Sequence, residues 1–269
     1  MITLASIHCY PVKGCRGLSL GSARLTPAGL EHDREWLVTD PGGRAITQRD
    51  SPGLARIDAV VEGAALVLSS DGAGAVHVPL DAGGPRSRVR VWDDDCGAID
   101  QGDEAAHWLG ERLGREVRLV RFDPDVRRPS DPAWAGDAHA PNRYSDGFPL
   151  LVVSLASLAD LNSRLEVPVP MERFRPNLVL DGLEPFGEDA LGDFGAGPLR
   201  LRVVKPCTRC VVTTTDQRTG ERLGEEPVRA LRTFRWDAAL RGVTFGQNTV
   251  VIEGAGSTLE VGQSFERLG

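Results

Sequence analysis

The chain has 269 residues, of which 41% are hydrophobic and 26% charged, as in a folded protein that forms one large domain or two of ordinary size. The net charge of −7 gives no support to general nucleic-acid binding, which needs a basic stripe. No stretch approaches the roughly 18 to 20 apolar residues of a membrane span, and the N-terminus lacks a signal-peptide pattern, so we expect a cytoplasmic protein without a membrane partner.

Short apolar runs divide the first half of the chain. Gly, Asp or Pro separates most of these runs, and their Val, Leu and Ile content predicts strands. The predicted strands cover Thr3–Tyr10, Glu35–Thr39, Ala55–Val61, Ala65–Ser69, Val76–Leu80, Ser87–Trp92 and Val117–Phe122. Pro79 restricts its strand to an edge. Ala105, Leu109 and Leu113 recur every four residues and predict a helix over Asp103–Leu113. So many short strands with tight turns are typical of a barrel or a sandwich.

The second half mixes strands and helices. Asp123–Tyr144 lacks periodicity and predicts a long loop, which in a compact protein is often functional. Ser154 can cap a helix whose buried side carries Leu155, Leu158, Leu161 and Leu165. A further helix is predicted near Pro227–Phe234. The predicted strands cover Leu150–Val153, Asn177–Leu180, Leu199–Val204, Val211–Thr215, Thr249–Glu253 and Leu259–Val261.

Cys207 and Cys210 form a Cys-x-x-Cys pair. A structural zinc site commonly uses two such pairs, and a thioredoxin-type site starts a helix, whereas strands are predicted on both sides here. The chain has five cysteines, an odd number that favours reduced thiols. Arg209 and Lys205 beside the pair favour a thiolate, the form that a soft metal binds. Spacing alone leaves two readings open, a metal-binding thiolate and two half-buried residues without a role.

Three basic residues stand in short motifs that suit an anion. Arg175, two residues before Asn177, can give a bidentate contact to a phosphate. Lys13 precedes Gly14, and a glycine lets the backbone approach a ligand closely. Arg34 follows an aspartate before a predicted strand. Taken by itself, each basic residue is more often an ordinary surface or turn residue.

Several fragments together resemble one family, the MOSC-domain proteins with an N-terminal β-barrel, which include the mitochondrial amidoxime-reducing component and its bacterial relatives. They occur in the family's order and span nearly the whole chain. The fragments are Tyr10–Lys13, Arg16–Gly17, Gly29–Trp36, Thr47–Arg49, Tyr144–Asp146, Ser157–Asn162, Phe174–Asn177, Cys207–Cys210, Thr213–Asp216, Phe245–Gln247 and Val261–Gly262. Each fragment alone is weak evidence for the family, whereas the whole set in this order is specific to it.

The resemblance implies a role for each matching residue. The family's second cysteine, Cys210 here, ligates molybdenum of the molybdenum cofactor (Mo-molybdopterin). The family positions that hold the pterin and its phosphate correspond to Lys13, Arg34, Arg175 and Asn177. Thr208 and Arg209 match positions in the cofactor loop. Asp146 matches a position near the metal, where it can handle protons. Gly14 departs from the family's frequent serine, which removes one side-chain contact and leaves a backbone N–H.

The family reaction is the two-electron reduction of N-hydroxylated compounds such as amidoximes, hydroxylamines and N-hydroxylated bases. We therefore expect a small N-hydroxylated substrate and, because no Cys-rich ferredoxin tail follows, a separate electron donor such as a ferredoxin, a flavin reductase or a b-type cytochrome. The expected fold is mainly β with some helices (α+β), with an N-terminal β-barrel-like domain over residues 1–120 packed on a β-barrel MOSC domain over residues 121–269.

Two other functions are open at this point. Cys210 can carry a persulfide in a sulfur-carrier or cofactor-binding module, because MOSC domains occur joined to sulfurase enzymes. The same association brings an expectation of pyridoxal phosphate binding. Alternatively, Cys207 and Cys210 can act together as a thiol redox pair. The barrel and the ordered anion-binding residues favour cofactor binding over both.

Overall fold

Two β-rich parts lie one above the other in the computed structural model, which describes residues 1–138 and 140–268. The first part of the chain contains β1 (Ile2–Cys9), β2 (Leu18–Leu20), β3 (Ser22–Thr26), β4 (Gly29–Leu30), β5 (Trp36–Thr39), β6 (Asp58–Glu62), β7 (Ala65–Ser70), β8 (Ala73–Pro79), β9 (Arg86–Val91), β10 (Asp94–Asp100), α1 (Asp103–Leu113) and β11 (Arg118–Phe122). The rest contains α2 (Pro132–Ala135), β12 (Leu150–Ser154), α3 (Leu155–Asn162), β13 (Leu178–Asp181), β14 (Asp193–Ala196), β15 (Leu199–Thr208), α4 (Val228–Phe234), β16 (Trp236–Asp237), β17 (Gly242–Glu253), β18 (Thr258–Glu260) and β19 (Ser264–Leu268).

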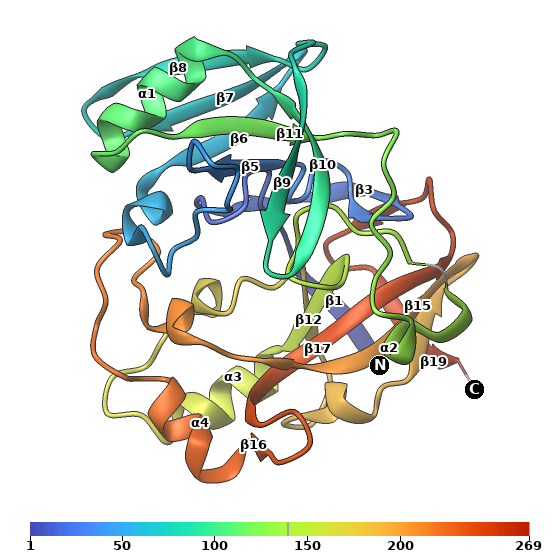
Figure 1. The fold of residues 1–269 in the computed structure, drawn as a ribbon. Coiled ribbons are helices and arrows are strands. Elements are labelled where there is room, and N and C mark those ends of the chain that lie inside the picture. The colour runs from blue at the N-terminus through green and yellow to red at the C-terminus, as the bar shows by residue number, and fades with distance from the viewer. Residues whose placement is uncertain (139, 269) are drawn as a thin grey trace.

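A closed barrel of seven strands forms the lower part in Figure 1. The strands follow the order β12-β13-β1-β19-β14-β15-β17, and β17 pairs back onto β12 through Val152 and Gln247. Only β12 and β13 are parallel among these neighbours. The interior is apolar, with Leu4, Phe194 and Phe265 buried together, and ring closure leaves no unpaired edge. The expected mainly β fold is therefore confirmed.

The upper part packs two small sheets and α1 around a second core. The sheets follow the orders β6-β7-β8 and β5-β11-β10-β9. Their core contains Trp36 and Leu109, the second of which lies on the apolar face predicted for α1. The helix ends at Gly114, whose left-handed conformation suits glycine and stops the helix where the sequence predicts. Pro79 ends β8 at the edge of its sheet, as expected.

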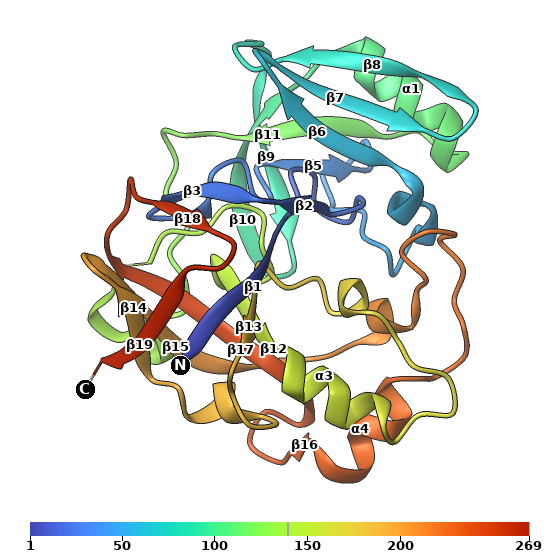
Figure 2. The same cartoon turned by 180° about the vertical axis from the view of Figure 1, so that it is seen from behind.

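Strand pairing crosses the predicted boundary near residue 120. The first strand, β1, lies in the barrel between β13 and β19, and β3 pairs with β18. Figure 2 shows β1 running from the barrel up to the other part. The domain limits themselves stay a prediction. The pairing means that the two parts share segments, so the loop after β1 is fixed at their junction.

Several elements differ from the sequence-based expectation. The predicted strand Val211–Thr215 is wrong, because Val211–Thr214 forms a 3₁₀ turn. The Thr213 hydroxyl donates to the Cys210 carbonyl at 2.9 Å, a local contact that competes with extended pairing. A second 3₁₀ turn, Pro52–Arg56, precedes β6 where a single strand is predicted. The predicted loop Asp123–Tyr144 contains the short α2. No helix within the described residues is long and apolar enough to cross a bilayer.

The Glu35 carboxylate provides a pH-dependent tie between segments of the upper part. Burial opposes its ionisation, but hydrogen bonds from His32 and Arg121 and the charges of Arg143 and Arg121 lower its pKa to about 2. A carboxylate whose pKa is lower in the folded than in the unfolded chain stabilises the fold above the ordinary pKa of 4.5. That stabilisation disappears as the pH falls towards 2.

We predict that Glu35→Gln removes this pH dependence. The difference in unfolding free energy between the unmodified protein and the variant should shrink by about 3 kcal/mol between pH 7 and pH 2. Urea unfolding across this pH range measures the difference. Glu62→Gln, at an exposed end of β6, is the matched control. Parallel stability curves for the unmodified protein and Glu35→Gln would contradict the prediction.

Candidate functional site

One pocket at the junction of the two parts brings together every residue that the sequence predicts for the site. These residues come from the loops after β1 and before β5, from the long loop before β12, from the segment before β13 and from the end of β15. They are Lys13, Gly14, Arg34, Asp146, Arg175, Asn177, Thr208, Arg209 and Cys210. The structure thus confirms that they lie together, whereas their individual roles stay predictions.

The Tyr10 ring organises the wall of this pocket. The guanidinium groups of Arg34 and Arg175 each lie 4.2 Å from its centroid, and its hydroxyl donates to the Pro176 carbonyl at 3.1 Å. Gly17 has to be a glycine, because a Cβ there would lie 2.3 Å from the Tyr10 ring. The Tyr-Pro-Val-Lys and Arg-Gly fragments of the sequence therefore serve one packing arrangement that places two cations.

Arg34 links three segments of the chain. Its Nη1 donates to the Asp33 carboxylate and, at 2.9 Å, to Oδ1 of Asn177, and its Nη2 donates to the Arg175 carbonyl at 3.1 Å. The Asn177 side chain also donates to the His8 carbonyl and is almost completely buried. Its polar atoms are thus engaged with the protein, so Asn177 positions Arg34 in this structure.

Arg175 is a half-buried cation whose hydrogen-bond partners are all neutral. Its Nη1 donates to the Cys15 carbonyl at 2.8 Å and to Oε1 of Gln217 at 3.1 Å. Burial lowers the pKa of Arg175 to about 10, and the nearby Arg34 charge acts in the same direction. A desolvated cation without a carboxylate gains free energy from an anionic ligand. The pocket therefore suits an anionic group beside Arg175.

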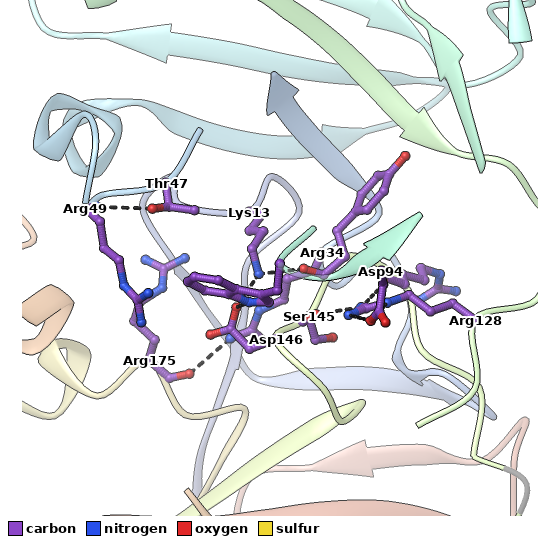
Figure 3. Close-up of polar contacts among 12 residues, drawn as sticks. Lys13, Arg34, Thr47, Arg49, Asp94, Arg128, Ser145, Asp146 and Arg175 are labelled. Carbon is purple, nitrogen blue, oxygen red and sulfur yellow. Dashed lines mark hydrogen bonds and ion pairs between the residues drawn. The ribbon is translucent and has the colours of Figure 1, made fainter. Parts of the chain in front are cut away.

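Lys13 and Asp146 form an ion pair at the opposite wall, as Figure 3 shows. The Lys13 Nζ lies 2.5 Å from Oδ1 of Asp146 and donates to the Tyr144 carbonyl at 2.8 Å. The indole N–H of Trp92 donates to the same carboxylate oxygen at 3.0 Å. The Asp146 side chain is 75% exposed, and the Lys13 charge and these hydrogen bonds hold its pKa well below the ordinary value. Asp146 is therefore a carboxylate at neutral pH.

The conformation of Gly14 explains the departure from the family's frequent serine. Its φ of +86° lies in the left-handed region, which glycine adopts without strain. A Cβ there would also lie only 3.0 Å from Cδ1 of Leu54. No described residue accepts a hydrogen bond from the Gly14 backbone N–H, so this donor is free to bind a ligand.

The two cysteines have different surroundings. Nη1 of Arg209 donates to Sγ of Cys207 at 2.8 Å, and Nη2 donates to the Phe174 carbonyl at 2.6 Å. Burial raises the pKa of the Cys207 thiol, although Arg209 acts against this. Sγ of Cys210 has no hydrogen-bond partner in the described part of the chain, and Cys210 lines the pocket. Of the two thiols, Cys210 is thus the one available to a ligand.

Lys205 contributes differently from the expectation. Its ammonium lies 4.9 Å from the centroid of the Trp134 ring, so this residue packs on an aromatic side chain. Of the two basic residues expected to favour a thiolate, only Arg209 contacts a cysteine, and that cysteine is Cys207. Lys205 and Cys207 are two residues apart and would share a face of a regular strand, but the pairing of β15 with β17 shifts between Pro206 and Thr208.

Two residues of the pocket wall, Trp92 and Arg49, are missing from the sequence-based set. Trp92 follows β9 with a φ of +57°, so it leaves the strand that the sequence predicts for it. The Arg49 guanidinium lies 4.2 Å from the centroid of the Trp92 ring. The Thr47–Arg49 fragment belongs to the family resemblance and was the available signal for Arg49, whereas nothing in the sequence marks Trp92.

The fold and the sequence agree on the class of protein. Residues 1–116 match the model of the MOSC N-terminal beta barrel domain, and residues 139–266 match that of the MOSC domain. The chain belongs to the MOSC-domain proteins that carry this N-terminal domain, as the resemblance predicts.

Within this class the chain is similar to amidoxime-reducing components. It is 34% identical to mitochondrial amidoxime-reducing component 1 of Homo sapiens, over 99% of this chain and 83% of the relative. It is 36% identical to the same component of Mus musculus, over 87% of this chain and 71% of the relative. Among solved structures, YiiM from Geobacillus stearothermophilus covers 64% of this chain and 71% of its own, with a TM-score of 0.35 and 16% identity.

We predict that Lys13→Met raises the pKa of Asp146, because the variant removes the ammonium charge and the hydrogen bond that lower this pKa. Carbon-13 NMR titration of the aspartate carboxyl groups in cofactor-free protein measures the change, and Asp146→Asn assigns the resonance. Lys205→Met is a matched control, since Lys205 contacts Trp134. An unchanged titration of Asp146 in Lys13→Met would show that the ion pair does not control its ionisation.

Proposed function

We propose that this pocket binds a molybdenum cofactor through the Cys210 thiolate, and that the protein catalyses the two-electron reduction of N-hydroxylated compounds. The observation that carries the proposal is that one pocket contains a thiol without a hydrogen-bond partner among the described residues, the buried Lys13 and the half-buried Arg34, Arg175 and Arg209. Amidoxime-reducing components at 32–36% identity make amidoximes, hydroxylamines and N-hydroxylated bases the substrate class of choice.

The chemistry of the pocket residues fits this cofactor. A thiolate is the ligand type that a soft metal prefers, and Cys210 supplies it. Arg175, Lys13 and the backbone N–H of Gly14 suit the pterin phosphate, because they are donors without a full set of anionic partners. The Nε of Arg209 is buried and has no partner among the described residues, so it is a further donor for a bound group.

The bound cofactor would supply the two-electron redox chemistry that cleaves an N–O bond. The overall reaction consumes two electrons and two protons per N-hydroxy group and releases the amine product and water. The protein's own contribution is to orient the substrate. Asp146, ionised through its contact with Lys13, accepts a hydrogen bond from the substrate's N–OH group at the pocket wall. Its low pKa favours this acceptor role over that of a resting proton donor.

The electrons come from a separate donor protein in this proposal. Cys9, Cys15 and Cys96 are buried apart from the pocket, and only Cys207 and Cys210 line it. A ferredoxin, a flavin reductase or a b-type cytochrome has the redox group that the reaction needs.

We predict that Cys210→Ser loses molybdenum and activity, whereas Cys207→Ser retains both the metal and the pterin. The unmodified protein, produced in a host that makes the cofactor, should carry about one molybdenum per chain, because one thiolate ligates it. Metal analysis by mass spectrometry, pterin fluorescence and reduction of benzamidoxime measure the three quantities. Loss of metal from Cys207→Ser with retention in Cys210→Ser would assign the ligand to the other cysteine.

A sulfur-carrier function is the second candidate, because Cys210 lines the pocket and its thiol has no hydrogen-bond partner among the described residues. A labile extra sulfur on Cys210, found by mass spectrometry in protein without molybdenum, would favour it. Activity that depends equally on Cys207 and Cys210, again without molybdenum, would favour a thiol redox protein.

A further inference from the structure

A second hollow adjoins the candidate cofactor pocket on the side of the upper part. The two hollows share the wall formed by Lys13, Thr47, Arg49 and Trp92. The second hollow, here called the basic recess, is otherwise lined by Arg44, Ala45, Asp50, Arg90, Val91 and Asp93. A ligand in the pocket can therefore extend past Trp92 into the basic recess.

The charges of the basic recess favour an anion. Arg49 has no carboxylate partner in residues 1–138 and 140–268, and its guanidinium rests on the Trp92 ring. Arg44 contacts Asp50 at 3.5 Å and Arg90 contacts Asp95 at 3.3 Å. Such solvent-exposed pairs are weak, so both arginines remain able to bind a stronger anion. This concentration of arginines stands out in a chain of net charge −7.

Trp92 offers an aromatic surface between the two hollows. Its residue surface is 43% exposed, which is large for a tryptophan in a folded protein. A φ of +57° is strained for a bulky residue and has to be held by other contacts. The bond from its indole to Asp146 and the stacked Arg49 provide such contacts. The protein therefore keeps this ring beside the pocket at a cost in backbone strain.

The hairpin that carries Trp92 is tied to the loop that carries Asp146. Buried Arg128 donates to Oδ2 of Asp94 at 2.6 Å and to the Ser145 carbonyl at 2.7 Å. Figure 3 shows Asp94, Arg128 and Ser145 beside Asp146. One arginine thus fixes the distance between the aromatic surface and the carboxylate.

We propose that Trp92 and the basic recess select planar N-hydroxylated substrates that carry a phosphate. The base stacks on Trp92, the N–OH group meets Asp146 in the pocket, and the phosphate binds Arg49 and Arg90 in the basic recess. Phosphorylated N-hydroxylated nucleosides are the substrate class with these three features. This inference rests on the proposed reductase function and specifies its substrate.

The test compares N-hydroxycytidine with its 5′-monophosphate, which differ only in the phosphate. Titration calorimetry on the molybdenum-loaded protein without an electron donor measures both dissociation constants, so it needs no turnover. The phosphate should bind about tenfold more tightly, because charge-assisted hydrogen bonds to arginine are added. Arg90→Gln and Arg49→Gln should each reduce this preference severalfold. Raising the salt concentration should reduce it as well.

Arg88→Gln is the matched control for Arg90→Gln. Arg88 lies on β9 two residues before Arg90, is exposed and does not line the basic recess, so its variant should keep the phosphate preference. Trp92→Leu should weaken binding of both compounds, whereas Trp92→Phe should restore most of it, since a ring is retained.

Three results would overturn the proposal. The first is equal affinity for the nucleoside and its phosphate, and the second is an unchanged preference in both Arg90→Gln and Arg49→Gln. The third is loss of pterin from these variants, which would place the basic recess in the cofactor site. Reduction of benzamidoxime by the same preparation tests the reductase function separately. A protein that reduces benzamidoxime but fails the binding comparison refutes only the substrate inference.

Discussion

The site depends on the contact of one buried aromatic ring with two guanidinium groups. Tyr10 ends the stretch that begins with β1, and Arg34 and Arg175 reach its ring from segments that are distant in sequence. Cation–π contacts of arginine contribute about 0.5 to 2 kcal/mol each, and the value rises as the pair is shielded from water. They offset part of the cost of burying charge, and Gly17 provides the space for the ring. The contact thus brings cations from two distant segments of the chain to one pocket.

Backbone strain is concentrated around the same pocket. Of the six non-glycine residues described with positive φ, three line it, namely Arg34, Trp92 and Arg175. Strained backbone persists where side-chain contacts over-determine it, and each of these residues has two or more such contacts. The pocket is therefore held in shape before any ligand arrives, which reduces the entropy lost on binding.

Local patterns in the sequence predict local structure well. The spacing of Ala105 and Leu109 and the glycine after the helix fix α1, because these signals act within a few residues. The 3₁₀ turn after Cys210 escapes prediction, since threonine hydroxyls there outweigh a β-rich composition. The strand β10 is not predicted from the sequence either, because it contains aspartates, which are rare in strands and common in turns.

The site residues lie too far apart in sequence for composition or periodicity to bring them together. Only the ordered family fragments predict that Lys13 and Cys210 share a pocket. Trp92 depends on a hairpin conformation that no local pattern specifies.

The pairing of β1 has a consequence for folding. Ile2 pairs with Phe265, so closure of the barrel joins two strands that are separated by nearly the whole described chain. Such a high contact order makes closure slow, and until β19 folds the start of β1 lacks its neighbour on that edge and is a segment for a chaperone to shield.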